Sequence, residues 1–165
     1  MSKAKAFSVL GRDPAPKPYR YTACGLDNVY LMNGFTPHKT SYGNGVSIDN
    51  LEELHRTIAR TLIDKKGPLT AKELRFLRHE LGLTQAEFAR RLGTEEQNIG
   101  RYERDEFPIP GSVDKLARAA YSVAFSLTIK ELAAMLDKQL ATKSATQKQV
   151  FRRKGEEWMR SAECH

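Results

Sequence analysis

The stretch TEEQNIGRYERDE, residues 94–106, gathers side chains that form strong and directional hydrogen bonds. Arg101 carries a planar guanidinium that can bind the O6 and N7 atoms of guanine, and Gln97 carries an amide that can pair with adenine. Glu95 and Glu96 stand at the front of the stretch, although a carboxylate is repelled by a polyanion. The free N–H groups in the first turn of a helix favour each carboxylate by about 0.3–1 kcal/mol at low salt. Both glutamates therefore fit the start of a helix.

The sequence shows no comparable set of residues for catalysis or metal binding. The histidines have neither the spacing of metal ligands nor a cysteine partner; they are His38, His55, His79 and His165. Two of them, His55 and His79, fall on predicted helices and are interpreted as surface residues. The GNG of residues 43–45 lacks the Lys-Ser/Thr of a phosphate-binding loop. We therefore expect no enzyme activity, no cofactor and no bound metal.

The residues around this stretch have the spacing of two helices that cross at a sharp turn. Counted from Gln85, Ala89 is the fifth residue, Gly93 the ninth and Ile99 the fifteenth. A small side chain allows a close helix crossing, and glycine accepts the positive φ of a tight turn. Ile99 then packs the second helix onto the first. The remaining apolar residues of the inner face are Phe88, Leu92 and Tyr102.

Capping boxes, a Ser or Thr followed three residues later by Glu or Gln, predict the start of three helices. The pairs are Thr70 with Glu73, Thr84 with Glu87, and Thr94 with Gln97. Two further helices are predicted from Ser112 and Thr128, the first with Val113, Leu116, Ala117 and Ala120 on one face. Residues 69–140 are therefore expected to form a compact five-helix domain.

The segment LRFLRHELGLTQAEFARRLGTEEQNIGRYERDE resembles the Cro/CI (Xre-type) helix-turn-helix family of transcriptional regulators. The resemblance covers roughly residues 69–137 and implies a homodimer that binds a double-stranded DNA operator, with helix 94–104 in the major groove. A small β-rich domain ahead of this unit is also similar to MqsA-family antitoxins, which hold zinc through two CxxC pairs. This chain has only Cys24 in that region, so no zinc is implied.

The resemblance assigns DNA contacts to individual residues. Glu96, Gln97 and Arg101 take base-reading positions, and Glu96 can accept a hydrogen bond from cytosine N4. Gln97 can instead turn back to Thr94 in a capping box. Phosphate and flanking contacts are implied for Thr84, Gln85, Arg90, Thr94, Asn98 and Arg104. A solvated basic face is the alternative for Arg90 and Arg104.

The same resemblance pairs an arginine of the first helix with the glutamate that follows the recognition helix. These are Arg78 and Glu103. We expect a partly buried ion pair that joins the two helices, and loss of one partner costs several kcal/mol.

The length of 165 residues fits one domain of ordinary size or two small ones. The net charge is +7 and the pI is near 9.5. A basic chain favours a polyanionic partner. No apolar run approaches the roughly 20 residues that span a bilayer, and no secretory signal is recognised at the N-terminus. Cys24 and Cys164 are interpreted as reduced thiols of a cytoplasmic protein.

The predicted fold class is α+β. A flexible lead-in (1–18) precedes a small α+β domain (19–67), the helix-turn-helix domain (69–140) and a basic tail (141–165). In the small domain we predict a β-hairpin of Tyr19–Cys24 with Val29–Leu31, a strand at Val46–Ile48, and a helix from Leu51 capped by Asp49 or Asn50. In the tail, Val150, Phe151, Trp158 and Met159 can anchor a terminal helix.

Residues 113–136 carry more apolar surface than one five-helix domain needs. A dimer interface is therefore predicted at Val123, Phe125, Leu127 and Leu132. The alternative is that Phe151 and Trp158 fold back and cover these residues within one chain.

Two interpretations remain for a set of aromatic residues and one methionine in the small domain, which are Tyr19, Tyr21, Tyr30, Met32 and Phe35. They form either a surface for a protein partner or the core of their own domain. The sequence thus predicts a sequence-specific transcriptional repressor. The alternative is an antitoxin of a type II toxin–antitoxin pair, which binds a toxin protein and autoregulates its operon.

Overall fold

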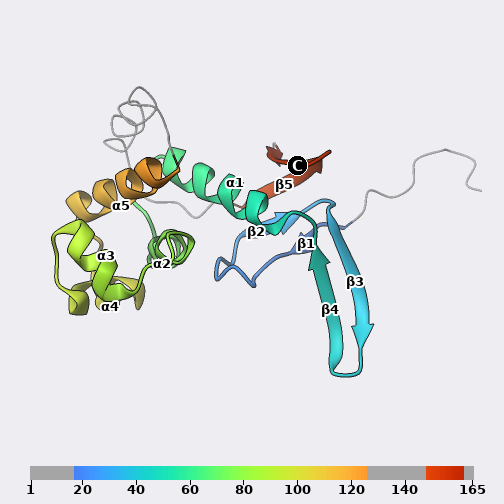
Figure 1. The fold of residues 1–165 in the computed structure, drawn as a ribbon, viewed down its shortest axis with the longest axis horizontal. Coiled ribbons are helices and arrows are strands. Elements are labelled where there is room, and N and C mark those ends of the chain that lie inside the picture. The colour runs from blue at the N-terminus through green and yellow to red at the C-terminus, as the bar shows by residue number, and fades with distance from the viewer. Residues whose placement is uncertain (1–16, 126–147, 162–165) are drawn as a thin grey trace, which may run out of the picture.

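A computed structural model of the chain describes residues 17–125 and 148–161 (Figure 1). The described part has the α+β class predicted from the sequence. Its strands are β1 (Tyr19–Arg20), β2 (Val29–Leu31), β3 (Phe35–Thr40), β4 (Gly43–Ile48), β5 (Gln149–Lys154) and β6 (Glu157–Ser161). Its helices are α1 (Leu51–Asp64), α2 (Ala71–Glu80), α3 (Gln85–Leu92), α4 (Glu96–Glu103) and α5 (Gly111–Ala124).

One four-stranded sheet joins strands from both ends of the chain, in the order β1-β2-β5-β6. Strand β2 pairs in parallel with β5, with Val29 opposite Gln149 and Leu31 opposite Phe151. Val29, Leu31 and Phe151 are fully buried. The prediction of a terminal helix is therefore wrong for residues 149–161. Their apolar side chains complete the sheet, because β2 offers β5 a free row of backbone hydrogen-bonding groups.

Helix α1 packs on β6 of this sheet and is fixed there by Trp158. The indole Nε1 donates to the Asp49 carbonyl at 3.1 Å, and the Thr57 hydroxyl donates to the Trp158 carbonyl at 3.3 Å. Asn50 stands at the N-cap of α1, but its side chain makes no cap hydrogen bond. It donates instead to the carbonyl of Glu156 at 2.7 Å, so Asn50 also ties α1 to the β5–β6 turn.

Strands β3 and β4 form a separate antiparallel ribbon that projects from the rest of the molecule (Figure 1). Only Val46–Ile48 of this ribbon was predicted as strand. Pro37, His38 and Lys39 are exposed and lack the apolar alternation of a strand that covers a core. The first predicted strand is also shorter than Tyr19–Cys24, because the chain turns between Thr22 and Gly25, where the Gly25 N–H donates to the Thr22 carbonyl.

Helices α2 and α3 begin at the predicted capping boxes, with Thr70 and Glu73 in one and Thr84 and Glu87 in the other. The third predicted box, Thr94 with Gln97, is wrong. Helix α4 starts later, with Glu95 as an N-cap that makes no side-chain cap hydrogen bond. The Thr94 hydroxyl accepts instead from the Asn98 amide at 3.3 Å. Helix α5 begins at Gly111, and the helix predicted from Thr128 lies outside the described residues.

The connection between α1 and α2 is held by the buried side chain of Arg118, on α5. Its guanidinium donates to Asp114 at 2.7 Å and to the carbonyls of Leu62, Ile63, Lys65 and Gly67 at 2.7–3.2 Å. Asp114 in turn accepts from the N–H of Leu69. Five hydrogen bonds from one side chain therefore hold α5 against the end of α1 and the segment that leads into α2.

A chain of side chains also crosses from the sheet to α2. The Tyr21 hydroxyl lies 2.8 Å from Nε2 of His55, and Nδ1 of His55 lies 2.8 Å from Glu80. His55 is half-buried here, so its interpretation as a surface residue is wrong, whereas His79 is exposed. Sheet, α1 and the later helices share one continuous cluster of buried apolar residues. None of the described helices is long and apolar enough to cross a membrane.

Candidate nucleic-acid interface

Helices α3 and α4 form the crossing that the sequence spacing predicts. Ala89 and Ile99 are buried at the crossing, and Phe88 is buried behind them. Gly93 ends α3 with φ of 66°, in the left-handed region that glycine tolerates best. Gly100 is also buried, and a Cβ there would lie 3.0 Å from a guanidinium nitrogen of Arg104. The sequence reasoning missed Gly100, although a glycine inside a predicted helix signals a close approach of another group.

An ion pair joins the second and fourth helices beneath this crossing. Arg78 of α2 donates to both carboxylate oxygens of Glu103, at 2.6 and 2.9 Å, and also to the carbonyl of Leu83 at 2.9 Å. Both side chains of the pair are nearly buried. The amide of Gln85 donates to the same carboxylate at 2.9 Å. Gln85 therefore links the start of α3 to the end of α4, rather than extending freely.

The three residues assigned to base reading are all exposed on α4. Glu96, Gln97 and Arg101 occupy the first, second and sixth positions of the helix, with Ile99 buried between them. Gln97 is exposed and forms no capping box, so that alternative for its side chain is excluded. The Arg101 guanidinium stands over the Phe107 ring, 5.6 Å from its centroid. This contact orients Arg101 from a residue that lies beyond the helix.

The residues assigned to phosphate and flanking contacts differ in how far they are engaged within the chain. Thr84 is held by its capping box, where its N–H and hydroxyl each donate to Glu87 at 2.8 Å. These bonds hold the pKa of Glu87 below its usual value. Arg104 donates to Glu106 at 2.6 and 3.2 Å, and this pairing lowers the pKa of Glu106. Arg90 is exposed on α3 and is therefore the more available phosphate ligand.

Helix α5 presents an apolar stripe to solvent. Leu116 is 46% exposed and Val123, two turns later, is 72% exposed. The sequence grouped Leu116 on one helix face with Val113 and Ala117, but these two are buried whereas Leu116 is exposed. Phe125 stacks on Tyr121 with ring centroids 4.3 Å apart, so it packs within the chain. The other two predicted interface residues, Leu127 and Leu132, lie outside the described residues.

The aromatic residues of the sheet region are used mainly inside the molecule. Tyr21 is buried, and Tyr19 packs against Phe35 with ring centroids 5.1 Å apart. Lys148 stands over the Tyr30 ring at 4.5 Å. Phe151 and Trp158 lie in the sheet and against α1, and they leave Val123 exposed. The aromatic cluster therefore packs largely within the chain, whereas the stripe on α5 stays open.

Residues 17–125 and 148–161 contain no group of three or more His, Cys, Asp or Glu side chains that could hold a metal ion. Cys24 is a free thiol in this part of the chain, and burial raises its pKa. The candidate site therefore consists of the exposed hydrogen-bonding side chains that α3 and α4 carry, among them Arg90, Gln97 and Arg101.

Comparison with known proteins agrees with this geometry over part of the chain. Residues 74–119, from α2 into α5, match a helix-turn-helix family model of the Cro/CI type. No curated protein and no solved structure gives a significant match to the chain. The matched family points to a DNA-binding regulator, while the similarity to MqsA-type antitoxins stays a prediction.

Proposed function

From the helix-turn-helix within residues 74–119, we propose that this protein is a cytoplasmic, sequence-specific repressor that reads an operator with α4. The observation that carries the proposal is the exposed set of Glu96, Gln97 and Arg101 on a helix with a buried opposite face. A helix of this kind fits the major groove, where each base pair shows a distinct pattern of donors and acceptors.

The two glutamates at the front of α4 favour selectivity over tight non-specific binding. Glu95 is the N-cap residue and Glu96 begins the helix, so both lie where the helix dipole stabilises a carboxylate. Near DNA, an unpaired carboxylate is repelled by phosphates unless a donor such as cytosine N4 meets it. Glu96 therefore favours sites with a correctly placed cytosine and lowers affinity elsewhere.

Phosphate contacts hold the helix pair in register on the duplex. Arg90 is free to bind a phosphate, whereas Arg104 must first leave Glu106. Gln85 and Thr84 act from the start of α3, where the Glu103 and Glu87 carboxylates already fix their positions. These contacts are common to all sequences, so they contribute affinity and salt dependence rather than selection.

A homodimer completes the proposed reader, because one recognition helix covers too few base pairs for a specific site. The exposed stripe of Leu116 and Val123 on α5 supports this assembly. Pairing through α5 would place two copies of α4 about one DNA turn apart, roughly 34 Å. The operator would then be a palindrome with half-sites at that spacing.

Selection of bound duplexes from random DNA tests the proposed function directly. We expect the full chain to enrich one palindromic sequence at physiological salt, with specific binding at least about 10³-fold tighter than binding to unrelated DNA. Enrichment of no sequence, with equal affinity for all duplexes, would rule out a sequence-specific regulator.

The β3–β4 ribbon supports a second candidate, an antitoxin that binds a toxin protein. The ribbon is paired only with itself among the described strands, and Tyr42 at its tip is fully exposed. Unpaired strand edges are a common site for strand addition by a partner protein. Copurification from the native host distinguishes the two candidates. A partner lost on deletion of residues 37–46 favours the antitoxin, and recovery of operator DNA alone favours the stand-alone repressor.

A further inference from the structure

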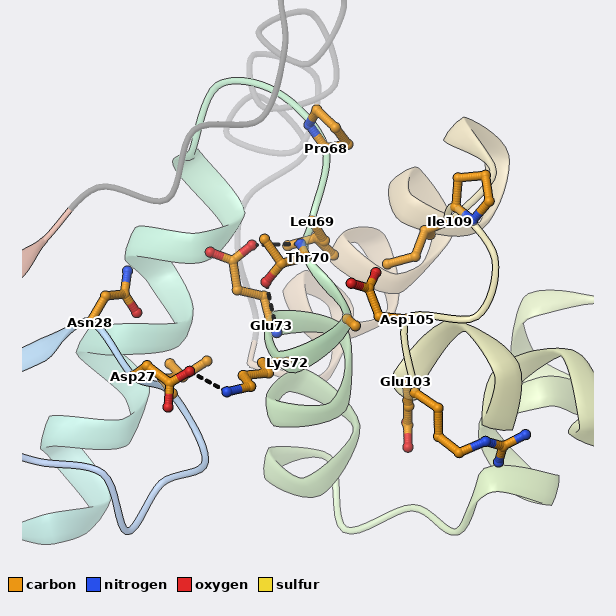
Figure 2. A pocket seen from close by; sticks show the side chains of 14 residues that line it. Asp27, Asn28, Pro68, Leu69, Thr70, Lys72, Glu73, Glu103, Asp105 and Ile109 are labelled. Atoms are coloured by element: carbon orange, nitrogen blue, oxygen red, sulfur yellow. Dashed lines mark hydrogen bonds and ion pairs between the residues drawn. The ribbon is translucent and has the colours of Figure 1, made fainter.

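A pocket of about 570 Å³ lies where the sheet, α2 and the segment after α4 meet (Figure 2). Its walls come from residues 26–28, residues 68–73, residues 103–105, Pro108 and Ile109. The volume falls within the range of about 300–1,000 Å³ that is typical of small-molecule sites. The pocket therefore has the size of a ligand site and touches the end of the proposed recognition helix.

The lining of the pocket is largely apolar. Leu26 and Leu69 are buried in its wall, and Ile109 is partly buried and packs against the same core. Pro68 and Pro108 add rigid apolar surface from the two connecting segments. A small organic molecule with an apolar body can replace water against these side chains.

Most charged groups around the pocket are already paired within the chain. Asp27 binds Lys72, and Glu73 binds Lys65 at 2.8 Å. Glu103 is held by Arg78. Asp105 is the lining carboxylate for which the described residues supply no hydrogen bond or ion pair. Both lining cations are also paired, Lys72 with Asp27 and Arg104 with Glu106, so the charge left unpaired among the described lining residues is the negative charge of Asp105.

Asp105 is held in place by the end of α4. Its own N–H donates to the Tyr102 carbonyl at 3.1 Å, and the next N–H donates to the Arg101 carbonyl at 2.9 Å. This pair of bonds closes a helix in the Schellman pattern, with Asp105 at the left-handed position, φ 60°, where glycine is usual. In Figure 2 its carboxylate lies between Ile109 and the Leu69–Thr70 segment.

We propose that this pocket binds a small organic cation, an amine with an apolar body, whose ammonium group pairs with Asp105 while the body lies against Leu26, Leu69 and Ile109. Such a ligand would contact the sheet loop and the residues that follow α4 at the same time. Resting on the proposed DNA-binding function, the site is an effector site: occupancy changes operator affinity, and operator binding changes ligand affinity by the same factor.

The test uses the isotopically labelled full chain and two probes of similar size and opposite charge, 2-phenylethylamine and 3-phenylpropionate. We expect the amine to shift the backbone amide resonances of residues 26–28, residues 69–72, Asp105 and Ile109, and the carboxylate to leave them in place. Asp105→Gly removes the carboxylate at a position that suits glycine, so the backbone turn is retained. We expect this variant to bind the amine about three- to five-fold more weakly.

Glu157→Gln is the matched control, because it removes an exposed carboxylate on β6 that does not line the pocket. Its amine affinity should equal that of the unaltered chain. The proposed site would be overturned by any of three results: equal binding of both probes, resonance shifts confined to other residues, or unchanged amine binding by Asp105→Gly. Amine binding without any change in affinity for the selected operator would overturn only its role as an effector site. Failure to bind any DNA would instead count against the proposed function.

Discussion

We propose that Arg101 on α4 reads bases, whereas Arg90 on α3 binds phosphate. Arg101→Ala should weaken operator binding by about 1–3 kcal/mol and relax selection at one base pair in each half-site. Arg90→Ala should weaken binding to all sequences alike and reduce the salt slope by about one. Affinities for a set of single-base operator variants at two salt concentrations measure both effects. Identical profiles for the two variants would show that the division into base and phosphate contacts is wrong.

A second prediction at the scale of one residue concerns Tyr21. Burial, followed by the negative charges of Cys24 and Glu80, raises the pKa of Tyr21 from 10.0 to about 12. Its contribution to stability is therefore fully present below pH 10 and is lost as the pH rises from 10 towards 12. Urea unfolding at pH 9 and at pH 11 measures how much unfolding free energy the protein loses over this interval. The loss should be smaller for Tyr21→Phe than for the unaltered chain.

Tyr42→Phe is the control for this measurement, because Tyr42 is fully exposed. It should lose as much stability as the unaltered chain over the same pH interval. An equal loss in Tyr21→Phe and Tyr42→Phe would mean that the environment of Tyr21 does not favour its protonated form.

At the scale of the elements, the contact between α2 and α4 depends on one buried ion pair. Arg78→Ala leaves the Glu103 carboxylate nearly buried with only the Gln85 amide as a donor. We expect a loss of about 3–5 kcal/mol in the free energy of unfolding. Arg75→Ala, on an exposed position of the same helix, should change it by less than about 0.5 kcal/mol.

Replacing both partners distinguishes an unpaired charge from lost packing. Arg78→Met with Glu103→Leu removes both charges and should recover much of the stability lost by Arg78→Ala. A double variant that is no more stable than Arg78→Ala would place the cost in packing and in the bond to the Leu83 carbonyl.

The elements that the sequence predicts well are those with local signals. Capping boxes mark the starts of α2 and α3, and Gly93 marks the turn between α3 and α4, because each signal lies within four residues of its effect. The start of α4 was misplaced because Thr94 bonds Asn98 instead. The β2–β5 pairing was missed because it joins residues 29–31 to residues 149–151, and no local pattern reports such a distant partner.

In the candidate site too, some features could be predicted from the sequence and others could not. The exposure of Glu96, Gln97 and Arg101 follows from helical spacing around Ile99, so the sequence could predict it. The engagement of Gln85 with Glu103, and of Arg101 with Phe107, could not be predicted. Both depend on how side chains from separate segments meet after the helices have packed.

For the whole molecule, we propose that the exposed stripe on α5 forms the dimer interface. Leu116→Asp with Val123→Asp should give a folded monomer with sharply reduced operator affinity, because one α4 contacts only a half-site. Light scattering at micromolar concentration measures the mass, and circular dichroism checks the fold. Met159→Asp, an exposed apolar residue on β6, is the matched control and should leave both mass and operator affinity unchanged.

A double variant that remains dimeric would place the interface elsewhere. An unaltered chain that is monomeric at this concentration would remove the proposed dimer altogether.

The parallel pairing of β2 with β5 also sets an order of events during synthesis. Strand β2 leaves the ribosome about 120 residues ahead of its partner, a delay of about 6–24 s at 5–20 residues per second. Through that interval the helices of residues 51–124 can form, while Val29 and Leu31 still lack Phe151 beside them. The nascent chain therefore carries an open, apolar strand edge that chaperones can recognise, and only the arrival of residues 149–161 closes it.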